Sequence, residues 1–170
     1  MKTKKDKKNH RVVVTGLGVV SSLGIGWEEF WAHLIAGKSG ISRVTAFDTS
    51  GHDRHFGGEV RQFKPTQFID KRKVLTLGRT SQLTIAAAKL ALKDGRIKLN
   101  SLKNFKAGVS IGTTMGESQV IEQIVKHGIK EDKFEVRSLR ALIYPADVVS
   151  TSLAQELRIG NSTILFANAC

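Results

Sequence analysis

Short apolar runs alternate with amphipathic helical patterns along this 170-residue chain, and that alternation constrains its fold most strongly. The candidate strands are β-branched and apolar, as expected of strands buried on both faces, and they cover 11–20, 107–111 and 162–167. Apolar residues recur at helical spacing over 27–35, 79–93, 116–128 and about 144–157. Strands that alternate with helices predict an α/β fold, with a mostly parallel sheet covered by helices.

Basic residues exceed acidic ones, giving a net charge of +12, and they gather in two segments. Residues 1–11 hold six Lys or Arg against one Asp, and residues 54–80 hold seven against one Glu and one Asp. We interpret residues 1–10 as a basic disordered tail. The second cluster is either a solvated face or a docking site for an acidic partner. Only 6% of residues are aromatic and no nucleic-acid motif is visible, so nucleic acid is not an expected partner.

The compartment is predicted from what the sequence contains. No apolar run approaches the roughly 20 residues that span a bilayer, and no secretory signal follows the basic start. The single cysteine cannot form an internal disulfide, which agrees with a reducing compartment. We therefore expect a cytoplasmic protein without a membrane span.

Two cofactor patterns are weak. The run from Gly16 to Ser21 imitates a dinucleotide fingerprint, but Ser21 replaces the third glycine and no acidic residue ends a second strand about 20 residues later. We expect these glycines to permit close backbone packing instead. None of the five histidines has a zinc spacing with Cys170. No cofactor and no metal are predicted.

Cys170, the only cysteine, follows the apolar run 164–167 and then Asn168 and Ala169. A buried strand that leads to a small residue and a cysteine suggests a nucleophile at a strand-to-helix turn. A helix N-terminus stabilises a thiolate, and a backbone N–H there can face a developing oxyanion. An inert core cysteine is the alternative interpretation.

Several segments, in this order, resemble the β-ketoacyl-acyl-carrier-protein synthases. They are 12–24 (VVVTGLGVVSSLG), 34–41 (LIAGKSGI), 47–50 (FDTS), 79–82 with 86–89, 111–116 (IGTTMG) and 168–170 (NAC). The resemblance covers about residues 11–170 and is nearest to the elongating branch of type II fatty-acid or polyketide systems. It implies a thiolase-like fold of two similar α/β halves. Residues 11–170 resemble the N-terminal half, with the C-terminal half absent.

The resemblance also implies a reaction, a decarboxylative Claisen condensation that makes a 3-oxoacyl-carrier. A cysteine thiolate takes an acyl group from acyl carrier protein, malonyl-carrier loses CO₂, and the carbanion attacks the acyl thioester. The family's two catalytic histidines and its lysine belong to the second half. We therefore expect this chain alone to be inactive.

Site residues follow from the same resemblance. Cys170 matches the acyl-accepting nucleophile, and Met115 matches a position in the acyl pocket where side-chain bulk limits chain length. Leu142 and Ile143 match a segment contributed across a dimer interface. The expected carrier-docking residues are basic and comprise Lys71, Arg72 and Arg137. Core packing for Met115 and a merely solvated basic face remain as alternatives.

The partners implied are an acidic acyl carrier protein, acyl and malonyl thioesters, and a second subunit in a homodimer or heterodimer. Two departures, Ser150 for a common asparagine and Asn168 for a common threonine, suggest a specialised branch. Two other functions stay open: a thiolase-like enzyme that uses coenzyme A substrates, and a non-catalytic partner subunit of a ketosynthase heterodimer. Because such partners generally lack the cysteine, Cys170 argues against the second.

Overall fold

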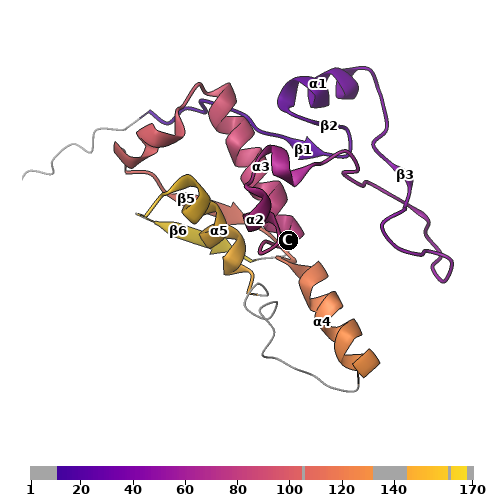
Figure 1. Cartoon of the computed structure of the whole chain (residues 1–170). Coiled ribbons are helices and arrows are strands. Elements are labelled where there is room, and N and C mark those ends of the chain that lie inside the picture. The colour runs from indigo at the N-terminus through magenta and orange to yellow at the C-terminus, as the bar shows by residue number, and fades with distance from the viewer. Residues whose placement is uncertain (1–10, 105, 132–144, 161, 168–170) are drawn as a thin grey trace, which may run out of the picture.

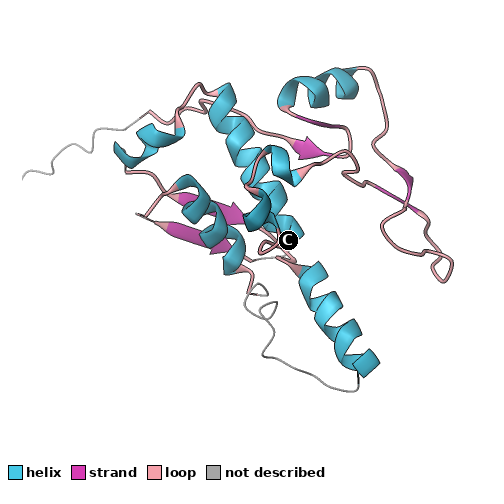
Figure 2. Cartoon of the chain, in the orientation of Figure 1, coloured by secondary structure: helices cyan, strands magenta, loops and turns pink. Residues whose placement is uncertain are grey.

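A computed structural model describes residues 11–104, 106–131, 145–160 and 162–167 (Figure 1). Its α-helices are α1 (Trp27–Ile35), α2 (Lys71–Val74), α3 (Arg79–Asp94), α4 (Ser118–Glu131) and α5 (Asp147–Leu157). Its strands are β1 (Val20–Ser21), β2 (Gly24–Ile25), β3 (Ser42–Arg43), β4 (Phe56–Gly57), β5 (Val109–Gly112) and β6 (Thr163–Phe166). Two short 3₁₀ helices are η1 (Pro65–Gln67) and η2 (Leu99–Asn104). Figure 2 shows how these helices and strands are distributed along the ribbon.

The packed body consists of β5, β6, α5 and α3. The two strands are parallel, with Val109 opposite Thr163 and Gly112 opposite Phe166. α5 packs on both strands and also against α3 (Figure 1). A helix that precedes its strand and covers a parallel pair is the arrangement that the alternating sequence pattern predicts. The α/β class is therefore confirmed.

The core lies where α3, α5 and β5 meet. Its buried apolar residues are Ile69, Ile85, Val109, Leu153, Ala154 and Leu157. α3 carries the small residues Ser81 and Ala86 on its buried face, so its backbone can approach its neighbours closely. Val149, Leu153 and Leu157 of α5 recur at helical spacing and are buried, as the sequence pattern predicts.

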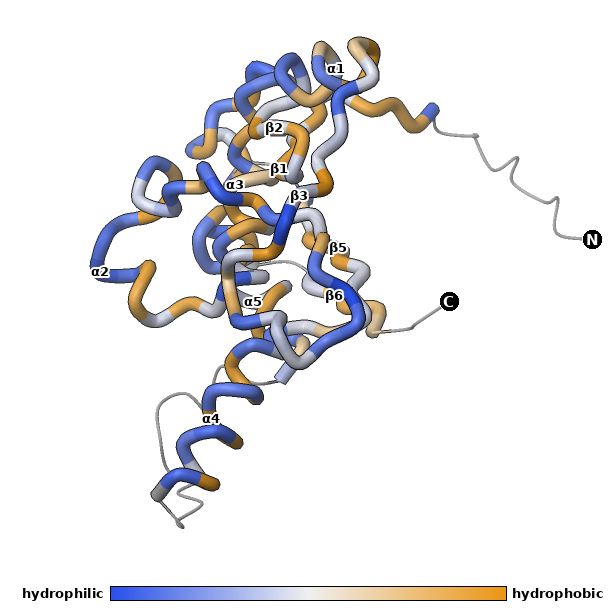
Figure 3. The backbone as a smooth tube through the Cα atoms, turned by 90° about the vertical axis from the view of Figure 1, so that its right-hand side faces the viewer, coloured by the Kyte–Doolittle hydropathy of each residue, from blue (hydrophilic) through white to orange (hydrophobic). Residues whose placement is uncertain are grey.

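The strand expected over residues 11–20 is wrong. Only Val20–Ser21 is a strand, and it pairs antiparallel with Gly24–Ile25. A strand needs a hydrogen-bonding partner, and within the described residues none pairs with 11–19. Figure 3 shows this apolar segment following the grey N-terminal trace, with Val12 and Val14 largely exposed.

The segment instead runs along α3. A side chain at Gly16 would lie 2.2 Å from the Ala91 carbonyl oxygen, and one at Gly18 would lie 1.9 Å from that of Ala87. Both distances are far below van der Waals contact, so glycine is required for this approach. The prediction that these glycines permit close backbone packing is confirmed.

Beyond the parallel pair, the described strands form two antiparallel pairs of two residues each, β1–β2 and β3–β4. α4 extends away from the packed body (Figure 1). Among the described residues, no helix is long and apolar enough to cross a membrane.

Candidate functional site

The carboxyl ends of β5 and β6 lie at the same edge of the sheet. The strand pairing continues past Gly112, because the Thr113 N–H donates to the Phe166 carbonyl at 3.0 Å. Chain segments that leave neighbouring parallel strands at this edge build ligand sites in open α/β sheets. Met115 follows β5 by three residues, and its side chain is 70% exposed.

Cys170 comes four residues after the end of β6 and lies outside the described residues. Leu142, Ile143 and Arg137 also lie outside them, within 132–144. The structure therefore places three of the predicted site residues: Met115 after β5, and Lys71 and Arg72 on α2.

A buried carboxylate ties the loop after β5 to α3. Glu117 is 1% exposed. Its Oε2 accepts the Thr80 N–H at 3.0 Å, and its Oε1 accepts the Ser81 N–H at 2.7 Å. These are the second and third N–H groups of α3, which the helix itself leaves unpaired. The loop and the helix are thus joined by two charge-assisted hydrogen bonds.

Further hydrogen bonds order the same loop. The Thr80 hydroxyl donates to the Gly116 carbonyl at 2.7 Å, and the Gly116 N–H donates to the Thr113 hydroxyl at 3.1 Å. Gly116 has φ +54°, a conformation that favours glycine. The backbone on either side of Met115 therefore has fixed hydrogen-bond partners.

The basic cluster predicted from the sequence includes the short helix α2. Asp70 caps this helix by accepting the Arg72 N–H at 2.9 Å. That backbone hydrogen bond, together with the charges of Arg72 and Lys73, lowers the pKa of Asp70. The Arg72 side chain is 93% exposed, and Lys71 is exposed as well. Both cations are therefore accessible to a partner.

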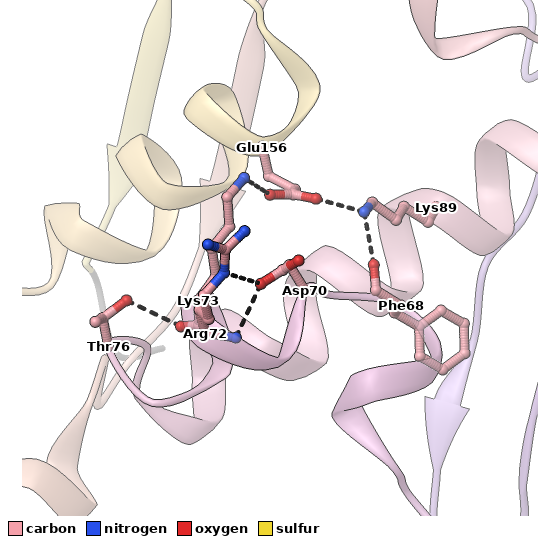
Figure 4. A network of polar contacts seen from close by, with 7 residues as sticks. All are labelled: Phe68, Asp70, Arg72, Lys73, Thr76, Lys89 and Glu156. Carbon is pink, nitrogen blue, oxygen red and sulfur yellow. Dashed lines mark hydrogen bonds and ion pairs between the residues drawn. The ribbon is translucent and has the colours of Figure 1, made fainter.

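Glu156 of α5 anchors this basic helix to the packed body (Figure 4). Its carboxylate forms ion pairs with Lys73 of α2 at 2.7 Å and with Lys89 of α3 at 2.5 Å. Lys89 also donates to the Phe68 carbonyl at 2.6 Å. Burial alone would raise the pKa of Glu156, but hydrogen bonds from Lys73 and Lys89 outweigh it and lower the pKa.

Three histidines, His33, His52 and His55, have contacts with residues nearby in the sequence. His33 Nδ1 lies 2.5 Å from the Leu23 carbonyl oxygen, and His55 Nδ1 lies 3.1 Å from the Thr49 hydroxyl. His52 packs edge-on against Phe47. Within the described residues, no group of three His, Cys, Asp or Glu side chains could hold a metal ion.

Sequence reasoning missed Glu117 and Glu156. One signal was present for Glu117: α3 begins Gly-Arg-Thr-Ser, with no acidic residue in its first turn and glycine at its N-cap. A helix start without its own acceptor implies an acceptor from elsewhere in the chain. For Glu156 no local pattern distinguished it from a solvated helix residue, because both lysine partners are more than 60 residues away.

A family model described as "Beta-ketoacyl synthase, N-terminal domain" matches residues 9–170. The chain belongs to the β-ketoacyl synthase family. The family resemblance predicted from the sequence motifs is therefore confirmed.

Similar proteins agree with this assignment. The 3-oxoacyl-[acyl-carrier-protein] synthase 2 of Synechocystis sp. is 38% identical over 112 residues, which cover 66% of this chain and 27% of that protein. The chloroplastic 3-oxoacyl-[acyl-carrier-protein] synthase I of Arabidopsis thaliana is 31% identical over 94% of this chain and 34% of its own length.

The solved structure titled "The ishigamide ketosynthase/chain length factor" superposes with a TM-score of 0.84. It is 35% identical and covers 91% of this β-ketoacyl synthase chain and 39% of the solved chain. The predicted thiolase-like fold is thus confirmed. This β-ketoacyl synthase chain spans between about a quarter and two fifths of the length of these three proteins.

Proposed function

We propose that the chain is the N-terminal half of a 3-oxoacyl-acyl-carrier-protein synthase in fatty-acid or polyketide elongation, with Cys170 as its nucleophile. The observation that carries this proposal is the family match, which runs from residue 9 to Cys170 itself. Two curated relatives with the name 3-oxoacyl-[acyl-carrier-protein] synthase support it. Localisation in the cytoplasm is part of the proposal.

The reaction has two steps. The Cys170 thiolate attacks the acyl thioester, forming a new carbon–sulfur bond as the carrier's thiolate leaves. Malonyl-carrier then loses CO₂, and the resulting carbanion attacks the acyl-cysteine. The new carbon–carbon bond releases the Cys170 thiolate and gives the 3-oxoacyl-carrier. The groups that promote decarboxylation belong to the second half, so the complete protein is required for turnover.

Met115 is proposed to line the acyl pocket. It lies in the loop at the carboxyl end of β5, the strand that pairs with the one leading to Cys170. Its side chain is 70% exposed among the described residues, so an acyl chain could contact it. A flexible thioether adapts to an alkyl chain.

The acidic acyl carrier protein is proposed to dock on the basic face of α2. Lys71 and Arg72 are exposed, whereas Lys73 is held by Glu156. Exposed cations steer an acidic partner and add specificity more than affinity. Arg137 is proposed as a third docking residue.

The second subunit is proposed to contact Leu142 and Ile143. A homologous partner subunit in a heterodimer is the second candidate arrangement, favoured by the likeness to a ketosynthase/chain length factor structure. A non-catalytic role for this chain itself is disfavoured because Cys170 is present.

The intact mass of the complete gene product, measured before and after incubation with acyl-carrier protein, tests the proposal. We expect a gain of one acyl group that is lost in Cys170→Ala. No gain would contradict the synthase and favour a partner subunit. Equal loading from acyl-coenzyme A and acyl-carrier would indicate the thiolase-like alternative instead.

A further inference from the structure

We propose that Glu117 is a positioning residue that fixes the loop carrying Met115 and so sets which acyl chain lengths the synthase accepts. The inference deepens the proposed function and rests on it. Met115 is proposed to limit the acyl chain length from its position in this loop, and Glu117 holds the loop to the packed body.

The carboxylate replaces a missing helix cap. The N-cap of α3 is Gly78, which has no side chain to accept the free N–H groups of the first turn. Glu117 accepts those of Thr80 and Ser81, the two that an N-cap side chain would normally take. The positive end of the helix dipole also favours a carboxylate there. The loop therefore supplies a cap from 36 residues away.

The surrounding space fits this carboxylate. A Cβ added at Gly78 would lie 2.2 Å from Glu117 Oε2, so the carboxylate occupies the place of a cap side chain. On the other side of the loop, a Cβ at Gly116 would lie 3.1 Å from Ala146, the N-cap of α5. The loop is thus held between the starts of α3 and α5.

Met115 depends on this anchoring. Its side chain is mostly exposed, so its own packing within the described residues does little to fix its position. Glu117 is two residues away, and the Thr80 hydroxyl holds the intervening Gly116 carbonyl. The backbone next to Met115 is therefore held by hydrogen bonds, which restricts where its side chain can contact an alkyl chain.

Glu117→Gln weakens the anchor with little change in size. One oxygen becomes an NH₂ group, which cannot accept an N–H of α3, so one of the two hydrogen bonds is lost together with the charge that complements the helix dipole. We expect the loop to loosen and the discrimination between neighbouring chain lengths to fall. A pocket that senses one methylene discriminates by roughly 10- to 200-fold, so a loss of about tenfold is expected.

The test uses the complete gene product and carrier-bound acyl chains of stepwise increasing length. The initial rate of Cys170 acylation is followed by intact mass, and the readout is the ratio of rates between neighbouring lengths. A merely structural residue would lower all rates or the melting temperature without changing this ratio. Glu122→Gln is the matched control, because Glu122 is an exposed residue of α4 that pairs with Lys126 of the same helix.

The expected result is a flattened length profile for Glu117→Gln and an unchanged one for Glu122→Gln. Thr80→Val, which removes the hydrogen bond to Gly116, should flatten the profile in the same direction and serves if Glu117→Gln does not fold. An unchanged ratio in a folded Glu117→Gln or Thr80→Val overturns the inference and leaves the synthase function intact. A wild type that is acylated at no chain length overturns both.

Discussion

The packed body (α3, α5, β5 and β6) and an outlying region (residues 11–61) both contain apolar helical segments, yet they bury them differently. α5 places five residues in the interior. α1, which the structure describes in full, has no buried residue although Trp31, Leu34 and Ile35 lie on one face. Amphipathic spacing specifies a helix, but the apolar face of that helix is buried only where another element packs against it. Within the described residues, the helices of the packed body have such neighbouring elements.

The two regions also differ in how their acidic residues are used. In the body, Glu117 and Glu156 join elements that are distant in sequence. In the outlying region, Glu59 accepts the Thr45 and Ala46 N–H groups at 3.0 and 2.8 Å and pairs with Arg61. The carboxylates of the body therefore bridge 36 to 83 residues of sequence, whereas Glu59 bridges no more than 14.

The largest effect is expected for Leu153→Ala. Leu153 is buried in the core of α3, α5 and β5. Its truncation removes apolar contacts and leaves a cavity, which costs about 2–5 kcal/mol of unfolding free energy. The shift of the urea midpoint at constant m-value measures it. A loss below about 0.5 kcal/mol would mean that this core does not carry the stability.

Glu156→Ala should have the next largest effect. The carboxylate is only 12% exposed and satisfies two lysines, so its removal leaves Lys89 without its carboxylate partner. The expected loss is about 1–3 kcal/mol. Glu122→Ala, which breaks the exposed pair with Lys126 on α4, should cost about 0.5 kcal/mol or less. Equal losses in urea unfolding would contradict the special role of Glu156.

The third prediction concerns pH in the outlying region. Hydrogen bonds from the Ala46 and Thr45 N–H groups, with Arg61, lower the pKa of Glu59 from 4.5 to about 2. A depressed carboxylate pKa contributes stability above pH 4.5 that is lost as the pH falls towards 2. The amide NMR shifts of Thr45 and Ala46 should therefore titrate with a midpoint near 2. A midpoint near 4.5 would show that these hydrogen bonds do not form.

The smallest effect is expected for Ile35→Ala on α1. The Ile35 side chain is 69% exposed, so its truncation in the 170-residue chain should change the unfolding free energy by no more than about 0.5 kcal/mol. The same urea experiment measures it beside Leu153→Ala. A cost comparable with that of Leu153→Ala would show that α1 is packed and would remove the contrast between the regions.

Sequence periodicity predicted the helices, buried or not, and the two strands that pair with each other. The helices near 27–35, 79–93 and 116–128 and the strands near 107–111 and 162–167 all appear, with ends shifted by at most three residues. Residues 11–19 failed because β-branched composition shows that a segment can form a strand and does not show what it pairs with. The glycines of that segment were interpreted correctly because a close approach leaves a local trace in the sequence.

Family resemblance predicted Met115, Lys71 and Arg72 as site residues, and the structure describes all three as exposed. Their roles stay predictions. Glu117 could not be predicted from its neighbours, because its function as a cap arises from contact with a helix 36 residues away. Capping rules consider only residues that are close to the helix start in sequence, whereas this cap comes from a residue that is distant in sequence.

Cys170 is the residue proposed to accept the acyl group, and peptide mapping can locate that group on the chain. The complete gene product is incubated with acyl-carrier protein, digested and analysed by mass spectrometry. We expect one acyl group on the peptide that contains Cys170, bound as a thioester that hydroxylamine cleaves and absent from Cys170→Ala. An acyl group on another residue, or none at all, would contradict the proposal.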